Sequence, residues 1–455
     1  MSATNAELQR PAGWLDRRFG VSTRGTTWGR EAIAGATTFA AMAYIIAVNP
    51  AIMSNAGMDR GELVIATALA AIFGSVMMGL TANLPLAVAP AMGSNVIFTY
   101  VIVKQMGVPW QGALAMVAFT GAVFLVLSLS KLRERVARDV PEALKIGIQA
   151  AVGTLIVSIG LRGAGVIVAS PSTLVTLGSL QSPAVLLTLA GLIVTPVLVV
   201  RGMPGALILS IAAMTLIGFF VPLAPGKMVT TAPATVMSLP RWPTDTFLAA
   251  DFGWLLTHFV VALPLLFYFV CAEFFSTLGT VIGVTGAAGL RRPDGSIPNA
   301  TAAFATDATS SIVGPLLGTS VVTAYIESVT GVQAGGRTGV TPLVVAALFV
   351  VALFFWPVFV IIPPQATAPA LVMVGVLMMQ GLARIDMADL AHAVPIVLTL
   401  LITVLSGNLV NGMALGTFSF IAVQLALGRG RAVTGIVWGL GVVFVAYFFV
   451  TSRLM

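Results

Sequence analysis

Long apolar segments separated by short polar connections run from residue 33 to residue 450. A helix needs about 20 apolar residues to cross the hydrocarbon core of a bilayer, and most of these segments are long enough. A polar, proline-containing connection at residues 222–250 divides them into two sets. The pattern predicts spans at 31–54, 62–83, 86–104, 109–129, 142–161, 181–200 and 203–221, and then at 253–284, 300–316, 319–333, 341–356, 365–381, 391–407 and 409–427.

Seven spans followed by seven indicate an internal repeat. Because each half has an odd number of spans, the two repeats would have opposite orientations in the membrane, as in many secondary transporters. We therefore predict an all-α polytopic membrane protein of about 14 transmembrane segments in an inverted 7+7 repeat. The apolar run 433–451 lies beyond the second seven. It is either a fifteenth span or a helix lying on the membrane, and the pattern leaves both open.

The basic residues support this count. With 14 spans, most of the basic loops fall on the same side as the arginine-rich segment 1–30. Cytoplasmic loops carry an excess of lysine and arginine, so the N-terminal segment is expected in the cytoplasm. The most basic connection follows the fourth predicted span and contains Lys131, Arg133, Arg135, Arg138 and Lys145.

Composition excludes a soluble protein. Of 455 residues, 58% are hydrophobic and 9% are charged, whereas soluble domains have about 25% charged residues. The net charge of +7 is concentrated in loops, so it indicates membrane orientation rather than nucleic-acid binding. The first thirty residues do not match a signal peptide. The single cysteine, Cys271, cannot form an intramolecular disulfide.

Two predicted spans differ from ordinary apolar helices. Residues 84–95 (LPLAVAPAMGSN) place two prolines and a glycine before a short apolar run, and residues 314–328 (GPLLGTSVVTAYIES) place glycines and β-branched residues before another. Both segments predict a short extended strand that enters a half-helix. They are the third and tenth spans, which correspond in the two halves, and such interrupted pairs indicate a substrate site near the membrane midplane.

Carboxylates within predicted spans are the main candidates for chemistry, because an ionised group at the bilayer centre costs at least about 2.5 to 3.5 kcal/mol. Glu273 lies deep in the eighth span and Glu327 lies at the strand-to-helix break of the tenth. Asp307 lies in the ninth span, next to several hydroxyl residues. Each also has a structural interpretation: Glu273 paired with a polar neighbour, Glu327 as a helix cap, and Asp307 as a hydrogen-bond acceptor.

Other candidate residues surround the interrupted spans. Asn95, preceded by Ser94, is placed to bind a ligand or to cap a half-helix. Tyr325 and Phe274 are placed to stack on a planar ligand, or to pack as ordinary membrane aromatics. His258 and His392 are isolated, so no metal site is expected. Without a Walker-type phosphate loop, two membrane carboxylates favour proton-coupled secondary transport with no cofactor other than the proton.

Several motifs resemble those of the azaguanine-type purine permeases, a branch of the nucleobase-cation symporter family that also includes uracil and xanthine permeases. The resemblance runs from about residue 30 to residue 427. Its most specific part is residues 323–339 (TAYIESVTGVQAGGRTG), and it also rests on residues 30–50 (REAIAGATTFAAMAYIIAVNP), 91–95 (AMGSN), 366–371 (ATAPAL) and 411–416 (NGMALG).

The resemblance implies a homodimer in which a core domain moves against a gate domain like an elevator. The implied parts are a cytoplasmic segment (1–30), the core domain (31–129 and 253–356), the gate domain (130–221 and 357–428), a connecting loop (222–252) and the C-terminal apolar segment (429–455). The resemblance also implies that Glu327, Glu273 and Asn95 bind substrate. The branch usually has Asp-Leu-Phe-Asp-Thr where this chain has residues 273–277 (EFFST), which leaves the base and the coupling stoichiometry open.

The resulting expectation is a purine importer of the inner, or plasma, membrane that uses proton symport and is not an enzyme. Glu273, Glu327 and Asp307 are the candidates for proton coupling, and Glu327, Glu273, Asn95, Tyr325, Ser94 and Phe274 are the candidates for substrate binding. The alternatives are a carrier of another planar amide compound, such as xanthine, a pyrimidine or an azole, or a carrier of anions. An intramembrane hydrolase and a non-transporting receptor or scaffold are alternatives of other classes.

Overall fold

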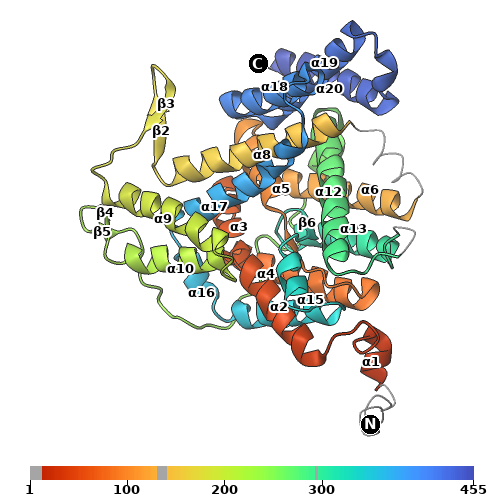
Figure 1. Ribbon diagram of the computed structural model, residues 1–455. Helices are drawn as coiled ribbons and strands as arrows, with labels where there is room; N and C mark the ends of the chain where they lie inside the picture. Colours follow the sequence, from red (N-terminus) through yellow and green to blue (C-terminus); the bar gives the residue numbers. More distant parts are fainter. Residues whose placement is uncertain (1–12, 131–140, 293–295, 455) are drawn as a thin grey trace.

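The computed structural model describes residues 13–130, 141–292 and 296–454, and almost all of its elements are helices (Figure 1). The elements before residue 230 are α1 (Trp14–Phe19), α2 (Trp28–Met42), α3 (Ile45–Met53), η2 (Ser54–Ala56), α4 (Arg60–Met77), η3 (Met78–Ala82), β1 (Val88–Pro90), α5 (Met92–Val96), η4 (Ile97–Gln105), α6 (Trp110–Leu129), α8 (Glu142–Gly163), β2 (Ile167–Ser170), β3 (Leu174–Leu177), α9 (Pro183–Val200), α10 (Ala206–Gly218), β4 (Pro222–Ala224) and β5 (Lys227–Met228).

The remaining elements begin with a short helix before the long α12. They are α11 (Phe252–Thr257), α12 (Phe259–Ala287), α13 (Ala300–Leu316), β6 (Val322–Ala324), α14 (Ser328–Gln333), α15 (Val340–Leu353), α16 (Trp356–Val360), α17 (Pro364–Met379), η5 (Gln380–Arg384), α18 (Leu390–Ser406), α19 (Leu409–Ala426), η6 (Gly430–Ala432) and α20 (Gly435–Leu454). The strands form three two-stranded sheets, β1–β6, β2–β3 and β4–β5.

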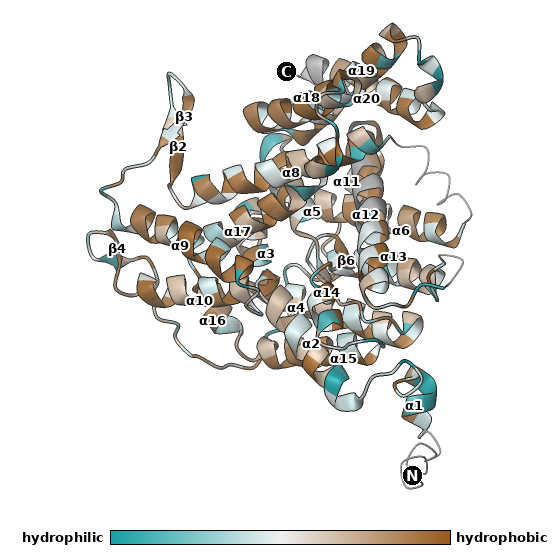
Figure 2. Ribbon diagram, in the orientation of Figure 1, coloured by the Kyte–Doolittle hydropathy of each residue, from teal (hydrophilic) through white to brown (hydrophobic). Residues whose placement is uncertain are grey.

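Each predicted span coincides with one of these helices or with an interrupted helical element. Within the described residues, seven helical stretches are long and apolar enough to cross a membrane, and five apolar helices are shorter. Hydrophobic residues cover most helices, whereas α1 is largely hydrophilic (Figure 2). The all-α membrane fold is therefore confirmed, and the count of 14 spans stays a prediction. Residues 131–140 of the basic connection lie outside the described residues.

The C-terminal apolar run is the helix α20, which packs against α19 and α12. Leu440, Phe444 and Tyr447 of α20 are buried in the main hydrophobic cluster. The ring of Phe444 lies edge-on to that of Phe418 in α19, with centroids 6.5 Å apart. The run is thus a packed helix of the protein, although its orientation to the bilayer stays open.

The packing of the helices repeats between the two halves. The second span, α4, packs on α15, and the corresponding α13 packs on α6. The fifth and twelfth spans, α8 and α17, also cross closely. At their crossing, a Cβ atom added to Gly375 would lie only 2.5 Å from the carbonyl oxygen of Gly153. Such reciprocal pairing is what an inverted repeat requires. The division into core and gate domains stays a prediction.

Candidate functional site

The two interrupted spans meet at a pair of short antiparallel strands in the interior of the molecule. Val88, Ala89 and Pro90 of β1 pair with Ala324, Thr323 and Val322 of β6. All six of these residues except Thr323 are apolar, and both strands are buried. The pairing satisfies backbone groups that would otherwise be unpaired inside a membrane. The predicted strand-to-helix elements are confirmed, and α5 and α14 begin just beyond the strands.

Glu327 lies at the N-cap position of α14, but its side chain does not cap that helix. Instead, the hydroxyl of Tyr44 donates a hydrogen bond to Glu327 Oε1 at 2.8 Å. Tyr44 is buried at the junction between α2 and α3, far away in the sequence. A carboxylate has about four acceptor positions, so Glu327 can accept N–H groups of a ligand while it is held by Tyr44.

Asn95 lies inside α5 rather than at its N-cap, which is Ala91. Its Nδ2 donates to Asn49 Oδ1 at 2.5 Å. Its own Oδ1 is buried and has no hydrogen-bond partner within the described residues. The cap interpretation is wrong for Asn95, and an acceptor oxygen without a partner is what a binding role needs. Ser94, the preceding residue, is 7% exposed.

Asp307 connects three elements of the interior. Asp307 Oδ1 accepts a hydrogen bond from the backbone N–H of Ala324 at 2.6 Å, and Oδ2 accepts from the hydroxyls of Thr323 at 3.1 Å and of Thr277. These bonds tie α13 to β6 and α12. They support the structural interpretation of Asp307 as an acceptor that holds the strand crossing, and its predicted part in proton coupling stays a prediction.

Glu273 differs from the other two carboxylates. It lies in α12 and is 2% exposed, and neither carboxylate oxygen has a hydrogen-bond partner within the described residues. Burying a charged group without a partner costs several kcal/mol by rough estimate. Glu273 therefore needs a proton or the N–H groups of a ligand. Its structural interpretation, pairing with a polar neighbour, is not what the structure shows.

The two candidate aromatic residues lie in different surroundings. The hydroxyl of Tyr325 donates a hydrogen bond to the carbonyl oxygen of Pro90, across the strand crossing. Phe274 packs in an apolar cluster with Phe124, Phe304 and Ala308, and its ring is edge-on to that of Phe124 at 6.2 Å. Tyr325 thus reinforces the site, while a ligand contact of Phe274 stays a prediction.

Comparisons with known proteins identify the family of the chain. A family model described as the permease family (Xan_ur_permease) matches residues 29–415. The chain belongs to this permease family. It is 41% identical over 420 residues to the adenine permease AdeP of Escherichia coli (strain K12), covering 92% of each chain. It is 38% identical over 439 residues to the guanine/hypoxanthine permease PbuO of Bacillus subtilis (strain 168), covering 95% of this chain and 99% of that protein.

Solved structures confirm the fold of the permease. The chain is similar to the transmembrane domain of a cyanobacterial bicarbonate transporter, BicA, with a TM-score of 0.60 and 18% identity over 83% of this chain and 96% of that chain. The family match and the permeases among its relatives show that the chain is a multi-pass membrane transporter and not an enzyme. The family match also confirms the resemblance inferred from the motifs.

The sequence pattern missed two residues of the permease site, Tyr44 and Asn49. Both lie in the first span, at or just after the interruption between α2 and α3. A signal was present, because the polar Asn49, followed by Pro50, interrupts an otherwise apolar run. The importance of these residues comes from their partners, Glu327 and Asn95, which no local pattern reveals.

The permease site lies where α5 approaches two helices of the predicted gate domain. A Cβ atom on Gly93 would lie 3.0 Å from the side chain of Val152 in α8 and 3.4 Å from that of Met378 in α17. A glycine at this position lets the start of α5 come close to both helices. The candidate ligand groups therefore lie near the boundary between the two predicted domains.

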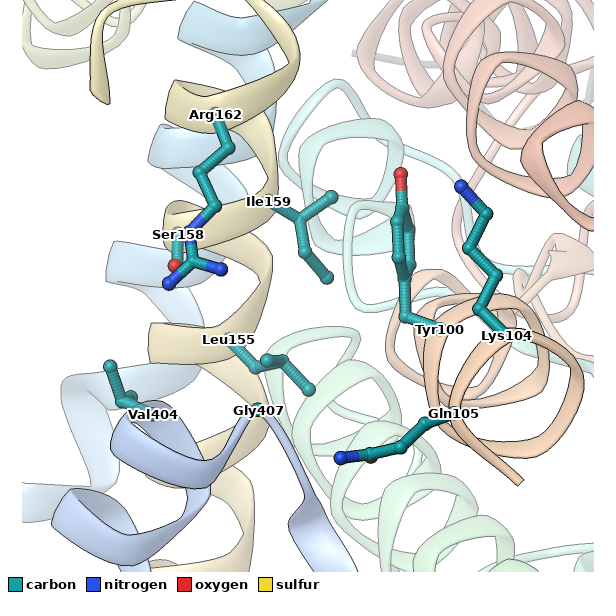
Figure 3. Close-up of a pocket in the computed structure, with 9 residues that line it drawn as sticks. All are labelled: Tyr100, Lys104, Gln105, Leu155, Ser158, Ile159, Arg162, Val404 and Gly407. Atoms are coloured by element: carbon teal, nitrogen blue, oxygen red, sulfur yellow. The ribbon is translucent and has the colours of Figure 1, made fainter. Parts of the chain in front are cut away.

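A cavity of about 250 Å³ lies along the same boundary, at the far end of the third span (Figure 3). Tyr100, Lys104 and Gln105 of η4 line one side, and Ser158 and Arg162 of α8 lie opposite. The ammonium group of Lys104 lies 5.5 Å from the centroid of the Tyr100 ring. Its lining is mainly apolar, with Leu155, Ile159 and Val404, and its charged groups, Lys104 and Arg162, are basic.

No group of three histidine, cysteine or acidic residues that could hold a metal ion is present in the part of the permease that the structure describes. His258 stacks on Trp254 with ring centroids 4.6 Å apart. His392 lies 2.9 Å from Asp389, which caps α18. Both histidines thus have local structural contacts.

Proposed function

We propose that the permease imports purine nucleobases of the adenine, guanine and hypoxanthine class by proton symport. The observation that carries the proposal is a pair of carboxylates on elements that meet in the interior: the half-buried Glu327, which is held by Tyr44, and the buried Glu273 of α12, which has no partner in the described chain. A neutral purine presents N–H donors that two carboxylates can accept in a dry site. The names of the relatives AdeP and PbuO support this substrate class.

The same proposal includes the setting of the protein. We propose a homodimer in the inner, or plasma, membrane with a cytoplasmic N-terminus, in which the core domain moves against the gate domain. The position of α5 against α8 and α17 supports such a movement, because a ligand held by α5 and α14 would travel with the core domain. Residues 273–277 differ from the usual pattern of the branch, so xanthine, a pyrimidine or an azole is the alternative substrate. An anion is disfavoured, because the site presents carboxylates.

Uptake of labelled hypoxanthine tests the proposed substrate and energy source together. In cells that lack their own purine carriers, we expect accumulation that is competed by adenine or guanine and abolished by a protonophore. Cells with an empty vector are the control. If the cells take up no hypoxanthine, and the protein instead binds pyrimidines, xanthine or azoles, the substrate belongs to the alternative class.

Glu273 is the proposed proton carrier, because its carboxylate has no donor in the described chain. Glutamine at this position cannot gain or lose a proton. We expect Glu273→Gln to lose accumulation against a gradient in proteoliposomes with an imposed proton gradient. Counterflow exchange of labelled for unlabelled base, which needs no net proton movement, is the comparison. A Glu273→Gln protein that still accumulates hypoxanthine in response to the proton gradient would show that another group carries the proton.

A further inference from the structure

Four buried polar side chains, one of which is Asn95, are connected to one another by a chain of hydrogen bonds. Asn49 comes from α3, Thr67 from α4, Asn95 from α5, and Thr319 from the segment before β6. Each of the four is 0% exposed. Because solvent does not reach these groups, their donors and acceptors must be matched within the protein or with a ligand.

Thr67 determines which side chains donate and which accept along this chain of hydrogen bonds. Its hydroxyl donates to the carbonyl oxygen of Leu63, one helical turn earlier, at 2.5 Å. A hydroxyl has a single proton, so Thr67 can only accept from Asn49, whose Nδ2 lies 2.7 Å away. The second N–H of Asn49 donates to Thr319 Oγ1 at 2.9 Å. Both N–H groups of Asn49 are therefore used, and its oxygen faces Asn95.

The orientation of Asn49 determines that of Asn95. Because Asn49 presents its oxygen, Asn95 presents its Nδ2, and the two atoms lie 2.5 Å apart. The atom of Asn95 left over is Oδ1, which is buried and has no partner within the described residues. An unpaired buried acceptor is unfavourable unless a ligand donates to it. A rotated amide would instead present its NH₂ group, and the two orientations have nearly the same shape.

We propose that Asn49 is a positioning residue that keeps the amide oxygen of Asn95 available to an N–H group of the transported base. Asn49 itself does not touch the base. The inference rests on the proposed function and adds a specificity rule to it: a base must have an N–H donor at the position that meets Asn95. Sites that hydrogen-bond a substrate group discriminate strongly against analogues that lack the group.

Competition by hypoxanthine analogues tests this rule. 1-Methylhypoxanthine, 7-deazahypoxanthine and 9-deazahypoxanthine each lack one of the N–H groups that hypoxanthine can present. In the wild-type permease we expect at least one of them to compete about tenfold less well than hypoxanthine for labelled hypoxanthine uptake. In Thr67→Val, whose side chain has the same shape without the acceptor, Asn49 and Asn95 can rotate. This analogue penalty, the factor by which an analogue competes less well than hypoxanthine, should then fall to about threefold or less.

The matched variants distinguish positioning from general packing. Thr67→Ser retains the hydroxyl and should keep the wild-type penalty. Thr120→Val is the control, because Thr120 is equally buried and donates to Met116 one turn earlier at 2.8 Å without belonging to the chain of four. It should also keep the penalty. If Thr67→Val does not fold, as judged by its melting in detergent, Thr319→Val provides the same test because it removes the other acceptor of Asn49.

An unchanged analogue penalty in folded Thr67→Val and Thr319→Val would overturn the inference, and so would a wild-type permease that binds all three analogues as well as hypoxanthine. A loss of affinity for every base without a change in the ratios would also contradict it, since the proposed role concerns discrimination. A wild-type permease that takes up no purine would instead overturn the proposed function, and that result is obtained before any variant is compared.

Discussion

Replacing Glu327 with glutamine is expected to reduce purine uptake about 100-fold or more. Glutamine has nearly the same shape as glutamate, but an NH₂ group replaces one of the two carboxylate oxygens. Either that group faces the hydroxyl of Tyr44, which then loses its acceptor at 2.8 Å, or it faces the N–H donors of the base. Losing one charge-assisted hydrogen bond and leaving a buried donor unpaired costs about 3 kcal/mol, which corresponds to roughly 100-fold.

The matched control for this prediction is Glu142→Gln. Glu142 lies in the first turn of α8 and is exposed, so the same chemical change there should leave uptake within about twofold of wild type. Tyr44→Phe removes only the bond that holds Glu327 and should reduce uptake by about tenfold. Both variants are to be compared at equal amounts of protein in the membrane. Uptake by Glu327→Gln within tenfold of wild type would show that Glu327 is not a principal ligand for the base.

The positions of the spans could be predicted from the sequence because the bilayer imposes a simple rule on each one. A segment must be apolar over about 20 residues, or its irregular backbone must be satisfied inside the protein. The strands β1 and β6 follow the same rule, since prolines and glycines before short apolar runs mark the places where the helix is interrupted. Glu327 was therefore located correctly at the break between β6 and α14.

The partners of the site residues could not be predicted in the same way. A helix cap is a local property, so Glu327 and Asn95 both had a cap as an alternative interpretation. Glu327 is instead bonded to a tyrosine 283 positions away, and Asn95 is bonded to Asn49, 46 positions away. Such pairs depend on how α3 packs against the interrupted spans. The hydropathy pattern carries no information on that packing.

The acceptor role of Asp307 illustrates the same limit. Its sequence neighbours Thr309, Ser310 and Ser311 suggested local hydrogen bonds, but their hydroxyls bond elsewhere. The donors to Asp307 come from Thr277, Thr323 and Ala324, on two other elements. The sequence could place a carboxylate in the interior. It could not distinguish Asp307, whose oxygens accept hydrogen bonds, from Glu273, whose oxygens have no partner among the described residues.

Another buried carboxylate, Glu31, was not singled out by the sequence pattern, and it supports the fold rather than the site. It lies in the first turn of α2 and is 0% exposed. Its Oε1 accepts from the backbone N–H groups of Arg337 at 2.8 Å and Thr338 at 3.1 Å. Its Oε2 accepts from the N–H and the hydroxyl of Thr341, at 3.1 and 2.6 Å. The negative charge also lies at the N-terminus of α15, where it is favoured by the helix dipole.

Glu31→Gln is accordingly expected to lower the free energy of unfolding by about 3 kcal/mol, because an NH₂ group would face donors that now share two carboxylate oxygens. The measurement is the melting of the purified protein in detergent, and Glu142→Gln is again the exposed control with the same chemical change. Glu31→Asp keeps the charge on a shorter side chain and should melt between Glu31→Gln and wild type. If Glu31→Gln melts at the same temperature as the control, the four hydrogen bonds do not stabilise the attachment of α2 to the start of α15. The position of α2 would then depend on packing, such as the close approach of Gly331 to Ala34 and Thr38.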